Sequence, residues 1–186
     1  MKMFKKLMAV ALAGVMALTV LTGCAGTVNK KDAIAYLNDT KALAEYDVKT
    51  IEAGDSALAK EALSKVKTYA ENHANKYETE VTYATEALRS LSYSSEAYRD
   101  VAGIIKAIVP DKTEDAYYLA FAIVPELKSK EMQNQRDYMI AQELEDNIVE
   151  LNGVDENLGD KAVASIASTK IGDDTFVVVV FVQAKK

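Results

Sequence analysis

The feature that most limits how this chain can fold is a run of seven apolar residues near its C-terminus, Phe176 to Val182, which reads FVVVVFV. A strand with one face in water alternates apolar and polar residues, whereas an unbroken apolar run indicates a strand buried on both faces. Such a strand needs a neighbouring strand on each side and helices above and below the sheet. A hairpin alone cannot provide this cover.

Two other segments can supply the neighbouring strands. Lys161 to Ile171 is rich in small and β-branched residues, and the turn Gly172-Asp173-Asp174 joins it to the apolar run, which predicts a C-terminal β-hairpin. Ala116 to Val124 (AYYLAFAIV) fits either a buried helix or a buried strand. Its length and its aromatic and β-branched content favour a strand. We expect this strand to be the second neighbour of the apolar run.

Most of the chain before residue 153 has the apolar spacing of helices. The first helix is expected to begin at Asn29 and to continue to the break at Gly54-Asp55-Ser56. Its predicted apolar face comprises Ile34, Leu37, Ala44, Val48 and Ile51. The face of the second helix comprises Leu58, Ala62, Val66 and Tyr69. Tyr77 to Leu91 fits a helix or a strand, and the residues Glu86-Ala87-Leu88-Arg89 favour a helix.

Two further helices are predicted. One begins at Ser94 and ends before Pro110, because the residue before a proline avoids the α region. The other begins at Pro125 and is expected to run to Asn152, with Gly153 just past its end. The sequence therefore predicts an α+β fold. Its helix-rich N-terminal two-thirds should pack on a small, mainly antiparallel sheet that a C-terminal β-hairpin completes.

The first residues have the composition of an export signal. Lys2, Lys5 and Lys6 precede any acidic residue, and Leu7 to Leu21 is apolar or small except for Thr19. The apolar run is about 15 residues long, which suits a signal peptide and is short for a membrane span.

The end of this run, Leu21-Thr22-Gly23-Cys24, resembles the lipobox of bacterial lipoproteins. The resemblance implies that a diacylglyceryl group is attached to the sulfur of Cys24 and that signal peptidase II cleaves before it. Cys24 is the only cysteine of the chain, so it has no disulfide partner and lipidation accounts for it. We therefore expect a signal peptide over 1–23, a lipidated N-terminus and short tether over 24–30, and one extracytoplasmic domain over 31–186.

The charge of the processed chain limits its partners. Three of the 22 basic residues lie in the signal segment, so 19 remain against 28 acids, a net charge of −9. This excess of acid argues against nucleic acid and against a second, electrostatic attachment to anionic lipid. The lipidated N-terminus is the expected contact with the membrane.

The motifs of common catalytic and metal sites are missing or incomplete. His73 is the only histidine and is expected to be a structural, hydrogen-bonded or half-exposed residue. Ser64-Lys65-Val66-Lys67 matches the S-x-x-K of penicillin-recognising enzymes without the S-D-N and K-T-G that accompany it there. We therefore predict no catalytic residues, no metal site and no cofactor.

Two groups of residues rich in acids are candidate sites. Asp155, Asn157 and Asp160 surround Gly159, but their spacing departs from that of a calcium loop, which favours a solvated turn. Glu143, Glu145 and Asp146 could act as an acid–base pair only in a cleft, and the helical pattern favours the outer face of a helix.

The ten tyrosines are more suggestive, because tyrosine provides contact area at a low cost in side-chain entropy. A ligand patch lined by tyrosines is therefore one expectation. The last strand, Asp174 to Val182, resembles the closing strand of secreted CAP (cysteine-rich secretory protein-like) domains, which are α-β-α sandwiches. The His and Glu motifs of that family have no counterpart in this chain.

Two functions of different class remain open. The favoured one is a lipid-anchored, non-catalytic binding or structural module at the extracytoplasmic face of the cell membrane, whose partner is an unknown envelope ligand or protein. The alternative is an enzyme that acts on cell-envelope material through carboxylates alone, since paired acids leave no sequence motif.

Overall fold

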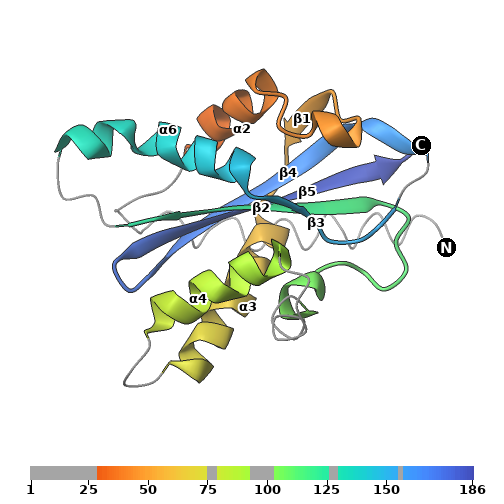
Figure 1. Cartoon of the computed structure of the whole chain (residues 1–186). Coiled ribbons are helices and arrows are strands. Elements are labelled where there is room, and N and C mark those ends of the chain that lie inside the picture. Colours follow the sequence, from red (N-terminus) through yellow and green to blue (C-terminus); the bar gives the residue numbers. More distant parts are fainter. Residues whose placement is uncertain (1–28, 75–78, 93–102, 126–129, 155–156) are drawn as a thin grey trace.

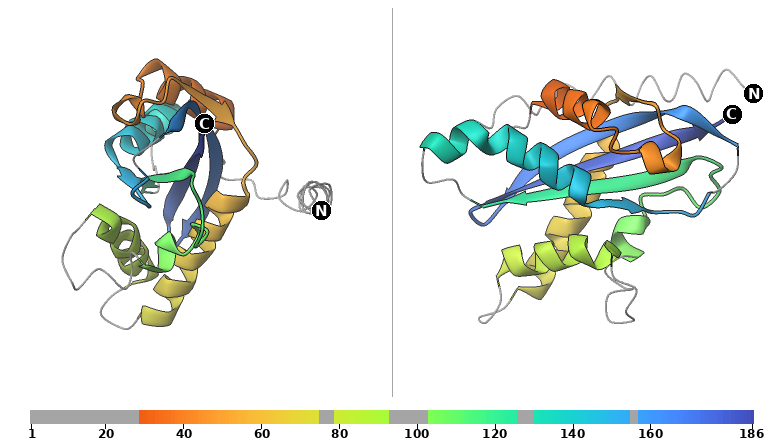
Figure 2. Two further views of the ribbon diagram at one scale, coloured as in Figure 1. Left: turned by 90° about the vertical axis from the view of Figure 1, so that its right-hand side faces the viewer. Right: turned by 45° about the horizontal axis from the view of Figure 1, so that its top comes forward.

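A five-stranded sheet with helices on both faces forms the centre of the computed structural model (Figure 1). The structure describes residues 29–74, 79–92, 103–125, 130–154 and 157–186. The strand order is β1-β4-β5-β2-β3. Helices α2 (Lys30–Asp39) and α6 (Lys130–Asp146) lie on one face of the sheet, and α3 (Ala57–His73) and α4 (Glu80–Arg89) lie on the other (Figures 1 and 2).

The apolar run is the central strand of this sheet. It lies in β5 (Asp174–Lys185), between β4 (Leu158–Ile171) and β2 (Ala116–Val124), and both pairings are antiparallel. The hairpin is formed by β4 and β5, with Gly172 in its turn at φ +59°. The three strand predictions and the predicted neighbour of the apolar run are therefore confirmed, as is the α+β class.

Alternate residues of the central strands belong to two separate hydrophobic cores. Val178 lies in the core beneath α3 and α4, and Val179 lies in the core beneath α2 and α6. Both are fully buried, and so are Phe176 and Phe181, one in each core. Each face of the sheet thus buries apolar surface, which is the condition that an unbroken apolar strand imposes.

The first predicted helix is shorter than expected. It ends at Asp39 and is followed by a positive-φ residue, Lys41, and by the short 3₁₀ helix η1 (Ala44–Tyr46). Ile51 lies in strand β1 (Thr50–Ala53), which pairs parallel with residues 161–164 of β4. The prediction that Ile51 extends the helical face was wrong, because pairing with a strand distant in sequence places it in the sheet.

The last predicted helix also ends early. Helix α6 stops at Asp146, and strand β3 (Ile148–Glu150) pairs antiparallel with residues 118–120 of β2. The helix predicted to reach Asn152 is therefore wrong over its final turn. Leu144 and Ile148 still pack in or against the same core, which explains why the helical spacing of apolar residues continued past the real end.

The remaining helices follow the sequence. Helix α3 buries Ala62 and Val66, as expected, and α4 confirms the choice of helix for the ambiguous segment before Leu91. The helix predicted to begin at Ser94 lies partly in residues 93–102, outside the described residues. Its described end is helical over 103–106 and buries Ile105 and Ile108.

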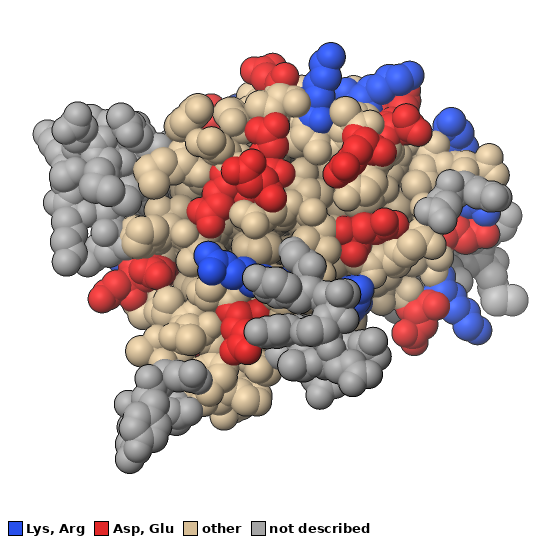
Figure 3. All heavy atoms as spheres, in the orientation of Figure 1, with Lys and Arg blue, Asp and Glu red and all other residues tan. Residues whose placement is uncertain are grey.

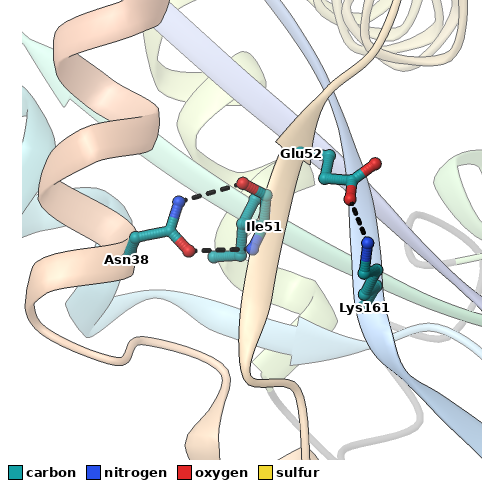
Figure 4. A network of polar contacts seen from close by, with 4 residues as sticks. All are labelled: Asn38, Ile51, Glu52 and Lys161. Atoms are coloured by element: carbon teal, nitrogen blue, oxygen red, sulfur yellow. Dashed lines mark hydrogen bonds and ion pairs between the residues drawn. The ribbon is translucent and has the colours of Figure 1, made fainter.

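Asparagine side chains cover the edges of the sheet. The Asn38 amide accepts the Ile51 N–H at 2.8 Å and donates to the Ile51 carbonyl oxygen at 2.9 Å, which pairs the free edge of β1 as a further strand would (Figure 4). On the other side of the sheet, Asn152 accepts the Tyr117 N–H at 2.7 Å and donates to the Asp115 carbonyl oxygen, beside the short edge strand β3. Backbone groups that are paired in this way are not free to pair with another chain, which is the common hazard of edge strands.

Replacing either of two neighbouring valines of β5 by aspartate should unfold the protein. Val178 and Val179 face different cores, so Val178→Asp and Val179→Asp each place an unpaired carboxylate in an apolar interior, at a cost of several kcal/mol. Domains of this size have only about 5–15 kcal/mol of stability. The matched control is Val163→Asp on β4, where the valine is 46% exposed and the substitution should be tolerated. Thermal melts that left either β5 variant near native would contradict a strand covered on both faces.

Candidate binding groove

A shallow groove of about 250 Å³ runs along the outer side of α3. Its lining residues are Ser64, Lys65, Thr68, Tyr69, Asn72 and His73 from α3, with Ile104 beside them. The α3 residues recur three and four positions apart, which places them on one broad side of the helix. Tyr69 and Ile104 supply apolar surface, and the other residues supply hydrogen-bonding groups, the mixture found in ligand sites.

An aromatic cluster forms one end of the groove. The Tyr69 and His73 rings stack with their centroids 4.1 Å apart and an interplanar angle of 24°. Tyr83 of α4 contacts both rings, with centroids at 6.2 Å from Tyr69 and 5.8 Å from His73. His73 Nδ1 lies 2.8 Å from the Tyr69 carbonyl oxygen. His73 is thus an exposed residue with a hydrogen bond to its own helix, and it also lines the groove.

The groove residues have the geometry of a binding surface rather than of a nucleophile with its base. Ser64 and His73 are nine positions apart on α3, which separates them by roughly 13 Å along the helix axis. The lysines of the S-x-x-K segment face acids, Lys65 with Glu61 at 3.6 Å and Lys67 with Glu71 at 3.7 Å. These ion pairs do not place either lysine as a general base for the Ser64 hydroxyl.

The acidic residues considered from the sequence do not converge on this groove. Asp160 lies in β4 and pairs with Lys49 at 3.4 Å, and the Gly159 carbonyl oxygen accepts from the Gln183 side chain at 2.6 Å. Asn157 has a positive φ, as in a turn, and Asp155 lies outside the described residues. Within the described ranges, no group of three His, Cys, Asp or Glu residues could hold a metal ion.

Glu143, on α6, has a raised pKa. Partial burial raises its pKa and nearby Asp146 adds to the rise, while the Ile123 backbone N–H and the Arg89 guanidinium act in the opposite direction. Strand β3 pairs only with residues 118–120 of β2, so Ile123 lies on an uncovered stretch of that edge. Glu143 is therefore placed to cover this edge, as Asn38 covers β1.

Several tyrosines have structural positions that the sequence did not distinguish from ligand contacts. Tyr118 is buried and its hydroxyl donates to Gln183 Oε1 at 2.7 Å. Gln183 also donates to the Tyr46 carbonyl oxygen at 3.1 Å, and the Tyr46 and Tyr118 rings lie 4.3 Å apart. Burial, followed by the charge of Glu45, raises the pKa of Tyr46 to about 12. A role for buried Gln183 was not predicted from the sequence. The only sequence signal was that a polar residue directly follows the apolar run.

Comparison with protein-family models, with curated proteins and with solved structures finds no match to this chain. The lipobox residues Leu21, Thr22, Gly23 and Cys24 lie outside the described residues. Among the helices that are described, none has both the length and the apolar composition needed to cross a membrane.

Replacing His73 by glutamine should leave the free energy of unfolding within about 1 kcal/mol of the original value, because the ring contacts and the hydrogen bond that it removes are at an exposed site. Tyr69→Ala is the comparison, since Tyr69 also packs against the core beneath α3 and should cost more. Chemical denaturation of both variants measures the difference. A larger loss for His73→Gln than for Tyr69→Ala would show that the histidine, and not the tyrosine, holds the cluster together.

Proposed function

We propose that this chain is a bacterial lipoprotein, anchored at the extracytoplasmic face of the cell membrane, whose domain binds an envelope ligand or protein without catalysis. The observation that carries the proposal is the N-terminal sequence, in which a basic start and an apolar run end at Leu21-Thr22-Gly23-Cys24. Two acyl chains are sufficient for stable attachment to a bilayer, whereas one is marginal.

The length of the tether supports a position close to the membrane. Helix α2 begins at Lys30, only six residues after Cys24, and this stretch spans at most roughly 20 Å when extended. The domain would therefore present its surfaces to ligands or proteins near the outer headgroups.

The groove on α3 is the binding surface that we propose. Its described lining combines a tyrosine ring, an imidazole ring and an aliphatic residue with two aliphatic hydroxyls, an amide and a lysine, and includes no carboxylate. One observation favours the alternative, a carboxylate enzyme acting on envelope material: the raised pKa of Glu143 beside Asp146. Binding is favoured because the Ile123 N–H gives Glu143 a structural role at the sheet edge.

Replacing Cys24 by serine should abolish lipid attachment, because the hydroxyl cannot replace the thiol that receives the diacylglyceryl group. The variant should appear as uncleaved precursor or in the soluble fraction, and it should not incorporate labelled palmitate. Cell fractionation and metabolic labelling measure this, with the conservative Thr19→Ser in the apolar run as control. A Cys24→Ser protein that is still cleaved and labelled would contradict the anchor.

A photo-crosslinking residue placed at Thr68 in the groove should capture an envelope component in living cells. Thr50 on β1 is the matched control, an exposed threonine that does not line the groove. We expect an adduct at Thr68 that is lost when Asn72→Trp fills the neighbouring part of the groove, and no adduct at Thr50. Equal labelling at both positions, or an adduct unaffected by Asn72→Trp, would rule out the groove as the binding surface.

A further inference from the structure

An aromatic pair joins α2 and α6 on the face of the domain opposite the groove, with Tyr36 partly buried and Tyr138 exposed. The rings of Tyr36 and Tyr138 meet edge to face, with their centroids 6.1 Å apart and their planes at 90°. Tyr138 is 61% exposed, the largest exposure of any large apolar side chain in the described residues. A tyrosine this open contributes little to the core, so its surface is available to a partner.

The surroundings of this pair are acidic. Loss of hydration raises the pKa of Tyr36, and the charge of Glu145 raises it further. Smaller contributions in the same direction come from Tyr138, from a hydrogen bond to Glu145 and from the charge of Asp146. Figure 3 shows acidic side chains grouped on the upper half of the face that carries α6. The charges of Glu45 and Glu150 likewise raise the pKa of Tyr46. Among the described residues, Glu145 and Asp146 are therefore acids close enough to the pair to act on it.

We propose that the Tyr36–Tyr138 pair is a docking surface for a lysine- or arginine-bearing segment of a partner protein. The ring faces attract a cation, and arginine also stacks on them. Glu145 and Asp146 add charge complementarity, which increases the rate of encounter and selects against acidic partners. Anionic lipid headgroups carry the wrong sign for this surface, so the complementary partner is a basic protein segment.

This docking surface shares no residue with the groove on α3 or with the lipobox. A negative result here therefore leaves the proposed anchor and groove intact, and the loss of either would not affect the aromatic pair.

The test measures binding of a fluorescent oligoarginine peptide to the full chain in a detergent with neutral headgroups, by fluorescence anisotropy. We expect Tyr138→Ala to weaken binding roughly two- to fivefold, since an exposed cation–π contact is worth about 0.5–1 kcal/mol. Tyr138→Phe should keep the affinity because the ring remains. Binding should weaken as salt rises to about 0.15 M, because exposed charges are then screened beyond about 8 Å.

A matched pair of acid substitutions separates this local site from general attraction to a negative protein. Glu145→Gln and Glu80→Gln each remove one charge, but Glu80 is exposed on α4, on the opposite face of the sheet. A loss for Glu145→Gln that exceeds the loss for Glu80→Gln supports the site. Equal losses, unchanged affinity of Tyr138→Ala, or no peptide binding at low salt would overturn the proposal. Binding of vesicles of neutral or anionic lipid that depends on Tyr138 would also overturn it, by making the pair a membrane contact.

Discussion

The fold depends on burying both faces of β5. Because its apolar run has no polar side, the strand is stable only between two other strands and between two layers of helices, and β4, β2, α2, α6, α3 and α4 supply these neighbours. Val178 and Val179 belong to different cores, although they are adjacent in sequence. The two cores are thus coupled through one strand, and a defect in either reaches the other through the same backbone.

A sheet whose centre is so apolar needs its outer edges protected. The edge strands are short, β1 with four residues and β3 with three, and side chains complete what they leave open. Asn38 pairs with both backbone groups of Ile51, and Asn152 covers β2 near Tyr117. By comparison, the exposed ion pair between Lys161 and Glu52, at 2.8 Å, adds little to the stability of the sheet, because solvent screens it (Figure 4). The part-buried amide contacts matter more than the surface ion pair.

The two outer faces of the domain differ in chemistry. The α3 side carries a groove with an aromatic and polar lining, and the α2–α6 side carries the Tyr36–Tyr138 pair beside Glu145 and Asp146. A lipid-anchored domain with a net charge of −9 would be repelled by anionic headgroups rather than lie flat on them. Both faces would then remain open to the partners that we propose, one for the groove and one of basic composition for the tyrosine pair.

The sequence by itself determined the elements whose patterns are local: the doubly buried strand, its hairpin, helices α3 and α4, and the strand beginning at Ala116. It indicated that His73 is structural, but not that Tyr69 and Ile104 lie beside it in a groove. Only the tertiary structure decided that Ile51 and Ile148 belong to strands, because helical spacing and burial against the same core give the same apolar pattern. The groove, the Asn38 edge contact and the Tyr36–Tyr138 pair each join residues from separate elements. Such contacts depend on how the helices pack across the sheet, and no local periodicity encodes that arrangement.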